Sequence, residues 1–219
     1  MVKHVSWGDL FDGERRPVPD RWTDPQTEFL ASMLYLTVLW GGNGLGKSMI
    51  LAEIARRALR GQLAWQTPGQ PYTVIIAGNT WTQIGETLRY LWDGIQPGEF
   101  KKGIRFEGGR VQGQRLAVFD FYVDGKRCGQ LRCGTFRAAN LAGPRADVVL
   151  SDEPLPEDVH SELMPRLIGR NGRMYVTFTP TLGTASNIDY LWRIIDDHGI
   201  TWAGEIQAPT TIENCTPRG

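Results

Sequence analysis

Long apolar segments are missing from this chain of 219 residues. No apolar run approaches the roughly 20 residues that a membrane-spanning helix needs. No apolar core follows the first residues, as it would in a secretion signal. The sequence therefore excludes a membrane-spanning protein, and we expect an intracellular location.

Cysteine and histidine are also scarce. The three cysteines, Cys128, Cys133 and Cys215, show neither CxxC spacing nor an even number, so they predict ordinary thiols rather than a disulfide framework. The three histidines lie far apart, which excludes the usual spacing of a zinc site. The fold must therefore rest on its apolar core, for which a chain of this length is large enough.

The chain has no net charge, because 24 Lys and Arg residues balance 24 Asp and Glu residues. The chain as a whole therefore has no net charge that would attract DNA or anionic lipid, and any contact with a polyanion must be local. One candidate patch consists of Lys101, Lys102, Arg105, Arg110 and Arg115. A solvated surface of strands and loops is the simpler explanation of the same cluster.

Apolar patterning predicts an α/β fold with a mostly parallel central sheet. Continuous runs of strand-forming residues, typical of buried strands, are found at 34–40, 72–77, 148–150, 174–178 and 201–206. Apolar residues at helical spacing predict a short helix from Asp24-Pro25 and further helices at 47–60, 80–92, 157–167 and 187–196. This alternation indicates parallel strands covered by helices.

Residues 103–136 break the alternation. Short strands there are separated by the turn signals Gly108-Gly109 and Asp124-Gly125, so we expect an antiparallel insertion or an antiparallel sheet edge. We expect an irregular lead-in at 1–24 and a linker at 208–219, because neither segment has an apolar period. The predicted domain is thus 25–207.

A glycine-rich segment stands between the first long strand and the following helix. Its sequence is Gly41-Gly42-Asn43-Gly44-Leu45-Gly46-Lys47-Ser48. It satisfies the phosphate-loop pattern G-x-x-x-x-G-K-[ST], whose glycines let backbone N–H groups point at a phosphate beside the positive end of a helix. We expect Lys47 to reach the β- and γ-phosphates of ATP and the Ser48 hydroxyl to bind Mg²⁺. A merely flexible turn is the alternative, and the flanking strand and helix argue against it.

An acidic pair follows the apolar strand at 148–150. Asp152 is the natural second ligand for Mg²⁺, because it comes at the carboxyl end of a strand, where ligands of open α/β sheets bind. Glu153 is placed to polarise the attacking water as general base, which indicates hydrolysis rather than transfer to a small acceptor. Alone, such a pair equally suits a loop or a helix cap. A phosphate loop in the same chain favours the catalytic interpretation.

Hydroxyl groups follow the next strand, in Thr177-Phe178-Thr179-Pro180. Thr177 and Thr179 stand where a side chain could sense the γ-phosphate and pass its loss to another surface. An ordinary strand end that is closed by proline is the alternative interpretation.

Together these residues resemble the ATPase domain of the large terminase subunit of tailed bacteriophages, the motor that packages viral DNA. Residues 41–48 look like the family's Walker A loop, 148–153 like its Walker B segment with the catalytic glutamate, and 177–180 like its coupling motif. The resemblance covers most of the chain. It implies a RecA-like P-loop fold, ATP and Mg²⁺ as ligands, and ATP hydrolysis as the activity.

The resemblance also implies roles for residues outside these motifs. Gln26 stands where the family contacts adenine, and Arg145 is similar to the arginine proposed to act on the ATP of a neighbouring subunit. Arg137 competes for that role. Arg145 could instead anchor a loop or pair with Asp147.

As a terminase motor, the protein would move double-stranded DNA into a procapsid, in the cytoplasm of the host cell. Its partners would be the portal protein ring and the small terminase subunit. We expect a homo-oligomeric ring when assembled, a monomer in isolation and no membrane contact. Many relatives carry a basic residue inside the phosphate loop, whereas Asn43, Gly44 and Leu45 of this chain are uncharged. The family also continues into a nuclease domain, which this sequence does not include. We therefore expect a motor domain without nuclease activity.

Two other functions use similar motifs. One is a helicase-like ATPase stimulated by nucleic acid, which would need a second RecA-like domain. The other is an ATP-dependent interaction switch that does not move DNA. Stimulation of hydrolysis by DNA or by the portal would separate the motor from the switch.

Overall fold

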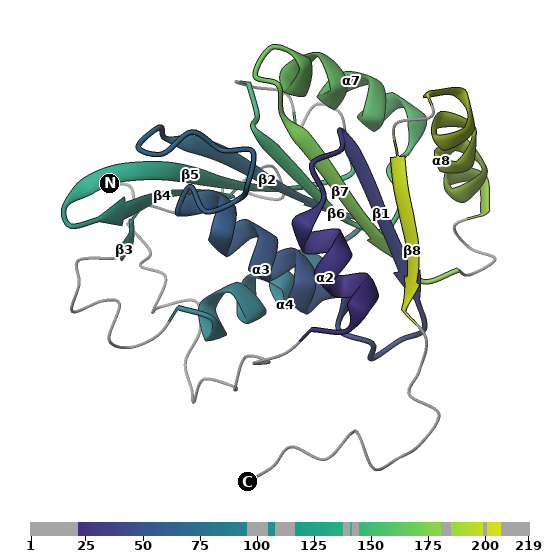
Figure 1. The fold of residues 1–219 in the computed structure, drawn as a ribbon, viewed down its shortest axis with the longest axis horizontal. Coiled ribbons are helices and arrows are strands. Elements are labelled where there is room, and N and C mark those ends of the chain that lie inside the picture. Colours follow the sequence, from purple (N-terminus) through teal and green to yellow (C-terminus); the bar gives the residue numbers. More distant parts are fainter. Residues whose placement is uncertain are drawn as a thin grey trace, which may run out of the picture.

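An eight-stranded sheet runs through the part of the chain that the computed structural model describes, which is residues 22–95, 105–107, 117–137, 141, 145–180, 185–198 and 201–206. The strands lie in the order β3-β4-β5-β2-β6-β7-β1-β8 (Figure 1). Their bounds are β1 Leu36–Gly41, β2 Tyr72–Gly78, β3 Arg105–Glu107, β4 Ala117–Val123, β5 Lys126–Thr135, β6 Val148–Asp152, β7 Arg173–Phe178 and β8 Thr201–Ile206.

Most of the sheet is parallel. All neighbours from β5 to β8 in this order pair in parallel, while β4 is antiparallel to β5 and β3 is antiparallel to β4. The predicted α/β fold with an antiparallel extension is confirmed. The extension is continuous with the main sheet, because β5 also pairs with the whole length of β2.

The hairpin of β4 and β5 turns at Asp124-Gly125, as the sequence predicts. Asp124 has a φ of 51° and Gly125 a φ of 75°. Positive φ at both turn residues matches the twist of the two flanking strands. The predicted turn at Gly108-Gly109 lies outside the described residues, as do the lead-in up to residue 21 and the tail from 207.

Helices cover both faces of the sheet. Their bounds are α2 Asp24–Ala31, α3 Lys47–Leu59, α4 Trp81–Asp93, α7 Glu157–Ile168 and α8 Ala185–His198. Figure 1 shows α2, α3 and α4 on one face and α7 and α8 on the other. The buried side chains accordingly form two cores, one beneath each set of helices. Within the described residues, no helix combines the length and the apolar character needed to cross a bilayer.

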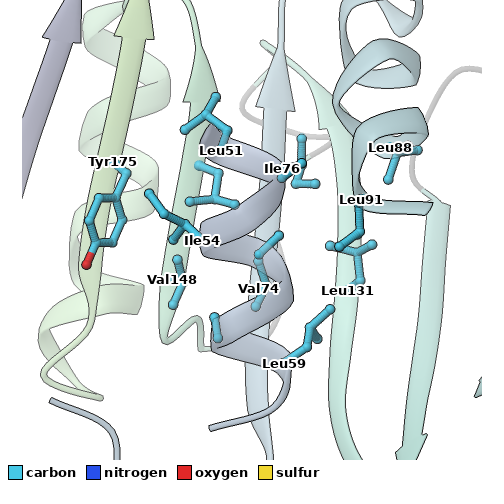
Figure 2. Packing of buried hydrophobic residues seen from close by; sticks show 14 of the residues in the cluster. Leu51, Ile54, Leu59, Val74, Ile76, Leu88, Leu91, Leu131, Val148 and Tyr175 are labelled. Atoms are coloured by element: carbon cyan, nitrogen blue, oxygen red, sulfur yellow. The ribbon is translucent and has the colours of Figure 1, made fainter. Parts of the chain in front are cut away.

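Helix α3 occupies the centre of the larger core. Figure 2 shows Leu51, Ile54 and Leu59 of this helix beside strand residues that include Val74 and Val148. All five side chains are at most 1% exposed. Full burial of one such side chain contributes about 1.5–3 kcal/mol relative to its exposure. The helix that begins at the glycine-rich loop is therefore firmly anchored to the sheet.

The strand order decides which segments meet at the carboxyl edge of the sheet. Strand β7 lies between β1, which leads into the glycine-rich loop, and β6, which ends at Asp152. Thr177 of β7 is the register partner of Leu39 on one side and of Asp152 on the other. Because the three strands are parallel, the loop, the acidic pair and the 177–180 segment emerge at the same edge.

Candidate nucleotide site

The loop between β1 and α3 depends on two glycines with positive φ. Gly44 and Gly46 each have a φ of 78°, in the left-handed region that residues with a side chain rarely adopt. Gly46 directly precedes α3 and supplies no side-chain cap. The first N–H groups of α3 are therefore not taken up by a capping side chain, which leaves them available for a phosphate.

Lys47 is buried at the base of the loop and only 8% exposed. Its Nζ donates to Gly41 O at 3.0 Å and to Gly42 O at 2.7 Å. Because an ammonium group has three protons, one remains for a ligand. Burial lowers the pKa of Lys47, while the charges of Asp152 and Glu153 raise it. The loop thus holds the lysine in place opposite two carboxyl groups.

Both carboxylate oxygens of Asp152 accept hydrogen bonds from hydroxyl groups. Ser48 Oγ donates to Oδ2 at 2.7 Å, and Thr177 Oγ1 donates to Oδ1 at 3.1 Å. Burial raises the pKa of Asp152, while these two hydrogen bonds and the charge of Lys47 lower it. The Ser48 hydroxyl and the Asp152 carboxylate form a pair of hard oxygen ligands, which suits Mg²⁺.

Glu153 has a backbone conformation that is rare for a residue with a side chain, with a φ of 109°. Its N–H donates to Thr177 O at 2.7 Å, and Ser151 Oγ donates to Glu153 O at 2.6 Å, so the turn is held on both sides. Oε2 of Glu153 is buried and has no hydrogen-bond partner among the described residues. A buried acceptor without a partner costs about 1–3 kcal/mol. Unpaired buried groups of this kind are found at catalytic sites.

The pKa of Glu153 is raised. Burial is the largest cause and repulsion by Asp152 the second, while a backbone hydrogen bond from Thr179 and the charge of Lys47 lower it. A raised pKa suits a general base, because proton transfer is most efficient when the catalytic pKa lies near the working pH.

These groups meet at one cavity of about 400 Å³, a size typical of small-ligand sites. The wall consists of the glycine-rich loop with the start of α3, the acidic pair with the end of β7, and one side of α4. The lining residues are Asn43, Gly44, Gly46, Lys47, Ser48, Met49, Gln83, Glu86, Tyr90, Asp152, Glu153 and Thr179. The structure therefore brings together most of the residues that the sequence singles out.

The two threonines of the 177–180 segment differ in position. Thr179 lines the cavity, and its Oγ1 donates to Asn43 Oδ1 at 3.1 Å. Thr177 is completely buried and uses its hydroxyl to orient Asp152. Of the two hydroxyls, that of Thr179 is therefore the one exposed to a ligand.

Gln26 lies beside the loop but not in the cavity wall. Its Oε1 accepts from Thr23 N at 3.0 Å, and its Nε2 donates to Leu45 O at 3.2 Å. The amide thus caps α2 and supports the loop from behind, which explains its burial. A contact between Gln26 and adenine stays a prediction.

Arg145 lies at the amino edge of the sheet, ahead of β6, with its side chain against Gly169 at the end of α7. Asp147 pairs with Arg170 at 2.8 Å, so the alternative pair of Arg145 and Asp147 is not formed. At about 3.3 Å per residue, the segment from Arg145 to Asp152 spans roughly 20 Å. Arg145 therefore cannot reach the cavity of its own chain.

Arg137, the competing arginine, follows β5 at the carboxyl edge of the sheet. It is exposed and lines a second cavity of about 270 Å³ together with Asn79, Thr80 and Trp81. This cavity adjoins the start of α4. The two arginines thus lie at opposite edges of the sheet, and either role remains a prediction.

Three residues of α4 line the main cavity without having been predicted for the site. Gln83, Glu86 and Tyr90 follow one another at i, i+3 and i+7, so they share one side of the helix. Ile84 and Leu88 on another side enter the core. The sequence shows the helical spacing of these three residues. It does not show that β2 pairs with β6, and this pairing turns their side of α4 toward the acidic pair.

The donor set fits a magnesium ion better than a transition metal. Within the described residues there is no group of three or more His, Cys, Asp or Glu side chains that could hold a metal. An ion bound at Ser48 and Asp152 would draw its other ligands from phosphate oxygens and water. Mg²⁺ is usually bound in this sparse way.

Comparisons with known proteins give a result at the level of structure alone. No protein-family model matches the chain, and no curated protein matches it. Among solved structures, a mutant of the large terminase ATPase domain of Thermus phage P74-26 has a TM-score of 0.61 at 17% identity, and the match covers 85% of this chain and 81% of that one.

Two longer structures match as well. The HK97 bacteriophage large terminase has a TM-score of 0.60 at 12% identity, covering 89% of this chain and 41% of that one. The large terminase of a thermophilic bacteriophage, solved in complex with ATP-gamma-S, has a TM-score of 0.56 at 14% identity, covering 85% and 45%. The chain spans less than half of these two proteins. It has the RecA-like fold of the ATPase domains of bacteriophage large terminases.

Proposed function

We propose that the chain binds ATP with Mg²⁺ and hydrolyses it as the motor domain of a DNA-packaging terminase. One observation carries the proposal. Lys47, Ser48, Asp152 and Glu153 come from two distant segments and line the same cavity. The likeness in fold to terminase ATPase domains supports the same conclusion.

The loop would bind the phosphates. Its glycines admit backbone N–H groups close to phosphate oxygens, and the positive end of α3 adds to the attraction. The remaining N–H of the Lys47 ammonium group would donate a hydrogen bond to a phosphate oxygen, and the charge of Lys47 would offset the negative charge that spreads over the transferred group. Ser48 Oγ and Asp152 would hold Mg²⁺, which would act there as a Lewis acid and withdraw negative charge from the phosphates.

Glu153 would take the proton of the attacking water. Glu153 lines the cavity, and its Oε2 has no protein partner in the described residues, so the carboxylate keeps an acceptor for the proton. The raised pKa of the carboxyl group favours uptake of that proton. Two hydrogen bonds hold the unusual backbone conformation of Glu153, which fixes the point from which its side chain extends beside Asp152.

Thr179 is the best-placed residue for coupling hydrolysis to movement. It lines the cavity and is bonded to Asn43 of the loop. Loss of the terminal phosphate would change its surroundings and so the end of β7. Thr177 would act indirectly, because its hydroxyl is bonded to Asp152.

Hydrolysis in an assembled ring would use an arginine from the neighbouring subunit. Arg145 is exposed and cannot reach its own site, so it remains our first candidate, with Arg137 as the competitor. We expect slow turnover from the dilute protein and faster turnover per chain at high concentration or with the portal ring. Full activity that is independent of concentration would speak against an arginine in trans.

The motor role is tested by the effect of DNA. We expect double-stranded DNA, together with the portal ring, to stimulate phosphate release by the 219-residue chain. An interaction switch would bind ATP without such stimulation. The Glu153→Gln variant should retain nucleotide binding and abolish packaging by the assembled complex.

A further inference from the structure

Gln83 brings to the cavity a hydrogen-bonding group that the proposed mechanism does not use. Its Oε1 accepts from Asn79 N at 3.1 Å and from Thr80 N at 3.3 Å. Because both partners are N–H donors, the atom that they meet has to be the amide oxygen. The NH₂ group has no partner among the described residues, and Gln83 lines the cavity. This group is therefore available to an acceptor on the ligand.

The sheet places Gln83 next to the acidic pair. Gly78 at the end of β2 is the register partner of Asp152 at the end of β6. Gln83 lies directly over Gly78, where an added Cβ would come within 3.8 Å of the Gln83 Cβ atom. Gln83, Asp152 and Glu153 accordingly line the same cavity.

The two backbone hydrogen bonds also determine how the side chain is held. Gln83 N donates to Thr80 Oγ1 at 3.3 Å, which completes a reciprocal cap at the start of α4. A glutamine whose oxygen is bound on two sides loses little further freedom when its NH₂ group meets a ligand. Such preorganisation is the property that makes a hydrogen-bond donor effective toward charge that develops during a reaction.

We propose that Gln83 is a further catalytic residue, whose Nε2 donates to an oxygen of the γ-phosphate. This inference rests on the proposed function. Lys47 would approach the phosphate from the loop, and Gln83 from α4. The donor on α4 would share the negative charge that spreads over the terminal phosphoryl group. Release of that phosphate would remove a contact from the first turn of α4.

Three variants distinguish loss of the NH₂ donor from loss of the helix cap. Gln83→Glu keeps an acceptor oxygen at a position where capping boxes accept either residue, but it replaces the NH₂ donor. Gln83→Met removes the donor and the side-chain half of the cap, while the bond from the backbone N of residue 83 to Thr80 Oγ1 remains. Thr80→Ala weakens the cap and leaves the NH₂ group in place, so it serves as the matched control.

The expected results differ between the variants. We expect Gln83→Glu to keep the melting temperature of the wild type and to lose about 10²-fold in kcat. Gln83→Met should melt earlier and lose kcat as well. Thr80→Ala should melt earlier but keep kcat within about twofold, because no reacting group is lost. KM should change less than kcat in Gln83→Met, since the donor acts mainly in the transition state. Gln83→Glu also places a negative charge beside the phosphates, so its KM should rise as well.

Lys47→Ala, measured in the same assay, separates the two proposals. If the wild type hydrolyses ATP and Lys47→Ala does not, while both Gln83 variants keep the wild-type kcat, the inference about Gln83 is overturned and the proposed function stands. If Lys47→Ala hydrolyses ATP as the wild type does, the proposed function fails and the inference fails with it.

Discussion

Ser48 Oγ donates to Asp152 Oδ2 at 2.7 Å, although 104 positions separate the two residues. The bond joins the first turn of α3 to the end of β6. Since α3 is anchored in the larger core and β6 is a buried strand, the distance between the loop and the acidic pair is set by the packing of the domain. A site built on such rigid elements is positioned before its ligand arrives.

Lys47→Ala tests the loop. Removing the ammonium group leaves the phosphates without their nearest protein cation, so we expect ATP binding to weaken by at least about tenfold and hydrolysis to fall by about 10²-fold or more. Titration with a fluorescent ATP analogue and a phosphate-release assay measure the two effects. Lys126→Ala, at the exposed first residue of β5, is the control and should behave as the wild type.

Glu153→Gln tests whether Glu153 acts as the general base. The substitution keeps the size of the side chain but removes its ability to take a proton, so we expect nucleotide binding to persist and kcat to fall by about 10²- to 10⁴-fold. In the wild type, kcat should rise with pH through the raised pKa of Glu153. A Glu153→Gln variant with normal turnover would assign the proton transfer to another residue.

The same substitution should change stability in a pH-dependent way. A carboxyl group whose pKa is raised by folding favours the folded state below its ordinary pKa and loses that contribution as the pH rises through the folded value. Because the pKa of Glu153 is raised, the ionised wild type carries a penalty that Glu153→Gln lacks. We expect the variant to melt at a higher temperature than the wild type at about pH 7.5 and at nearly the same temperature at about pH 4. Thermal melts at both values check this, and a constant difference would contradict it.

Ser48→Ala tests the proposed magnesium site. Losing the hydroxyl removes one hard oxygen ligand and the hydrogen bond to Asp152. We expect the Mg²⁺ concentration for half-maximal hydrolysis to rise about tenfold, with complete loss of activity in EDTA for every variant. Ser48→Thr keeps a hydroxyl and should need little more Mg²⁺ than the wild type. An unchanged Mg²⁺ requirement in Ser48→Ala would remove Ser48 from the site.

The bond between Asn43 and Thr179 should couple the loop to the end of β7. We expect Asn43→Ala and Thr179→Val each to alter ATP affinity and the double variant to deviate from the sum by about 0.5–3 kcal/mol. Binding titrations of the four proteins give this coupling energy. Strict additivity would mean that the two residues act independently.

The local elements of the site were predictable from the sequence. The β1 strand, the glycine loop and α3 follow one another within about 25 residues. Their apolar periods indicate the strand and the helix, and the glycines and the lysine between them indicate the phosphate loop. The end of β6 at Asp152 was predictable for the same reason, because a short buried run stops at the acidic pair. Each of these features depends on neighbours along the chain.

What the tertiary structure decided is the set of contacts between distant segments. Strand order inserts β7 between β1 and β6, so that Thr177 orients Asp152 while Thr179 reaches Asn43. The pairing of β2 with β6 brings Gln83 to the cavity. Strand order and register depend on how whole faces pack against one another, and no local period in a sequence specifies which strands become neighbours.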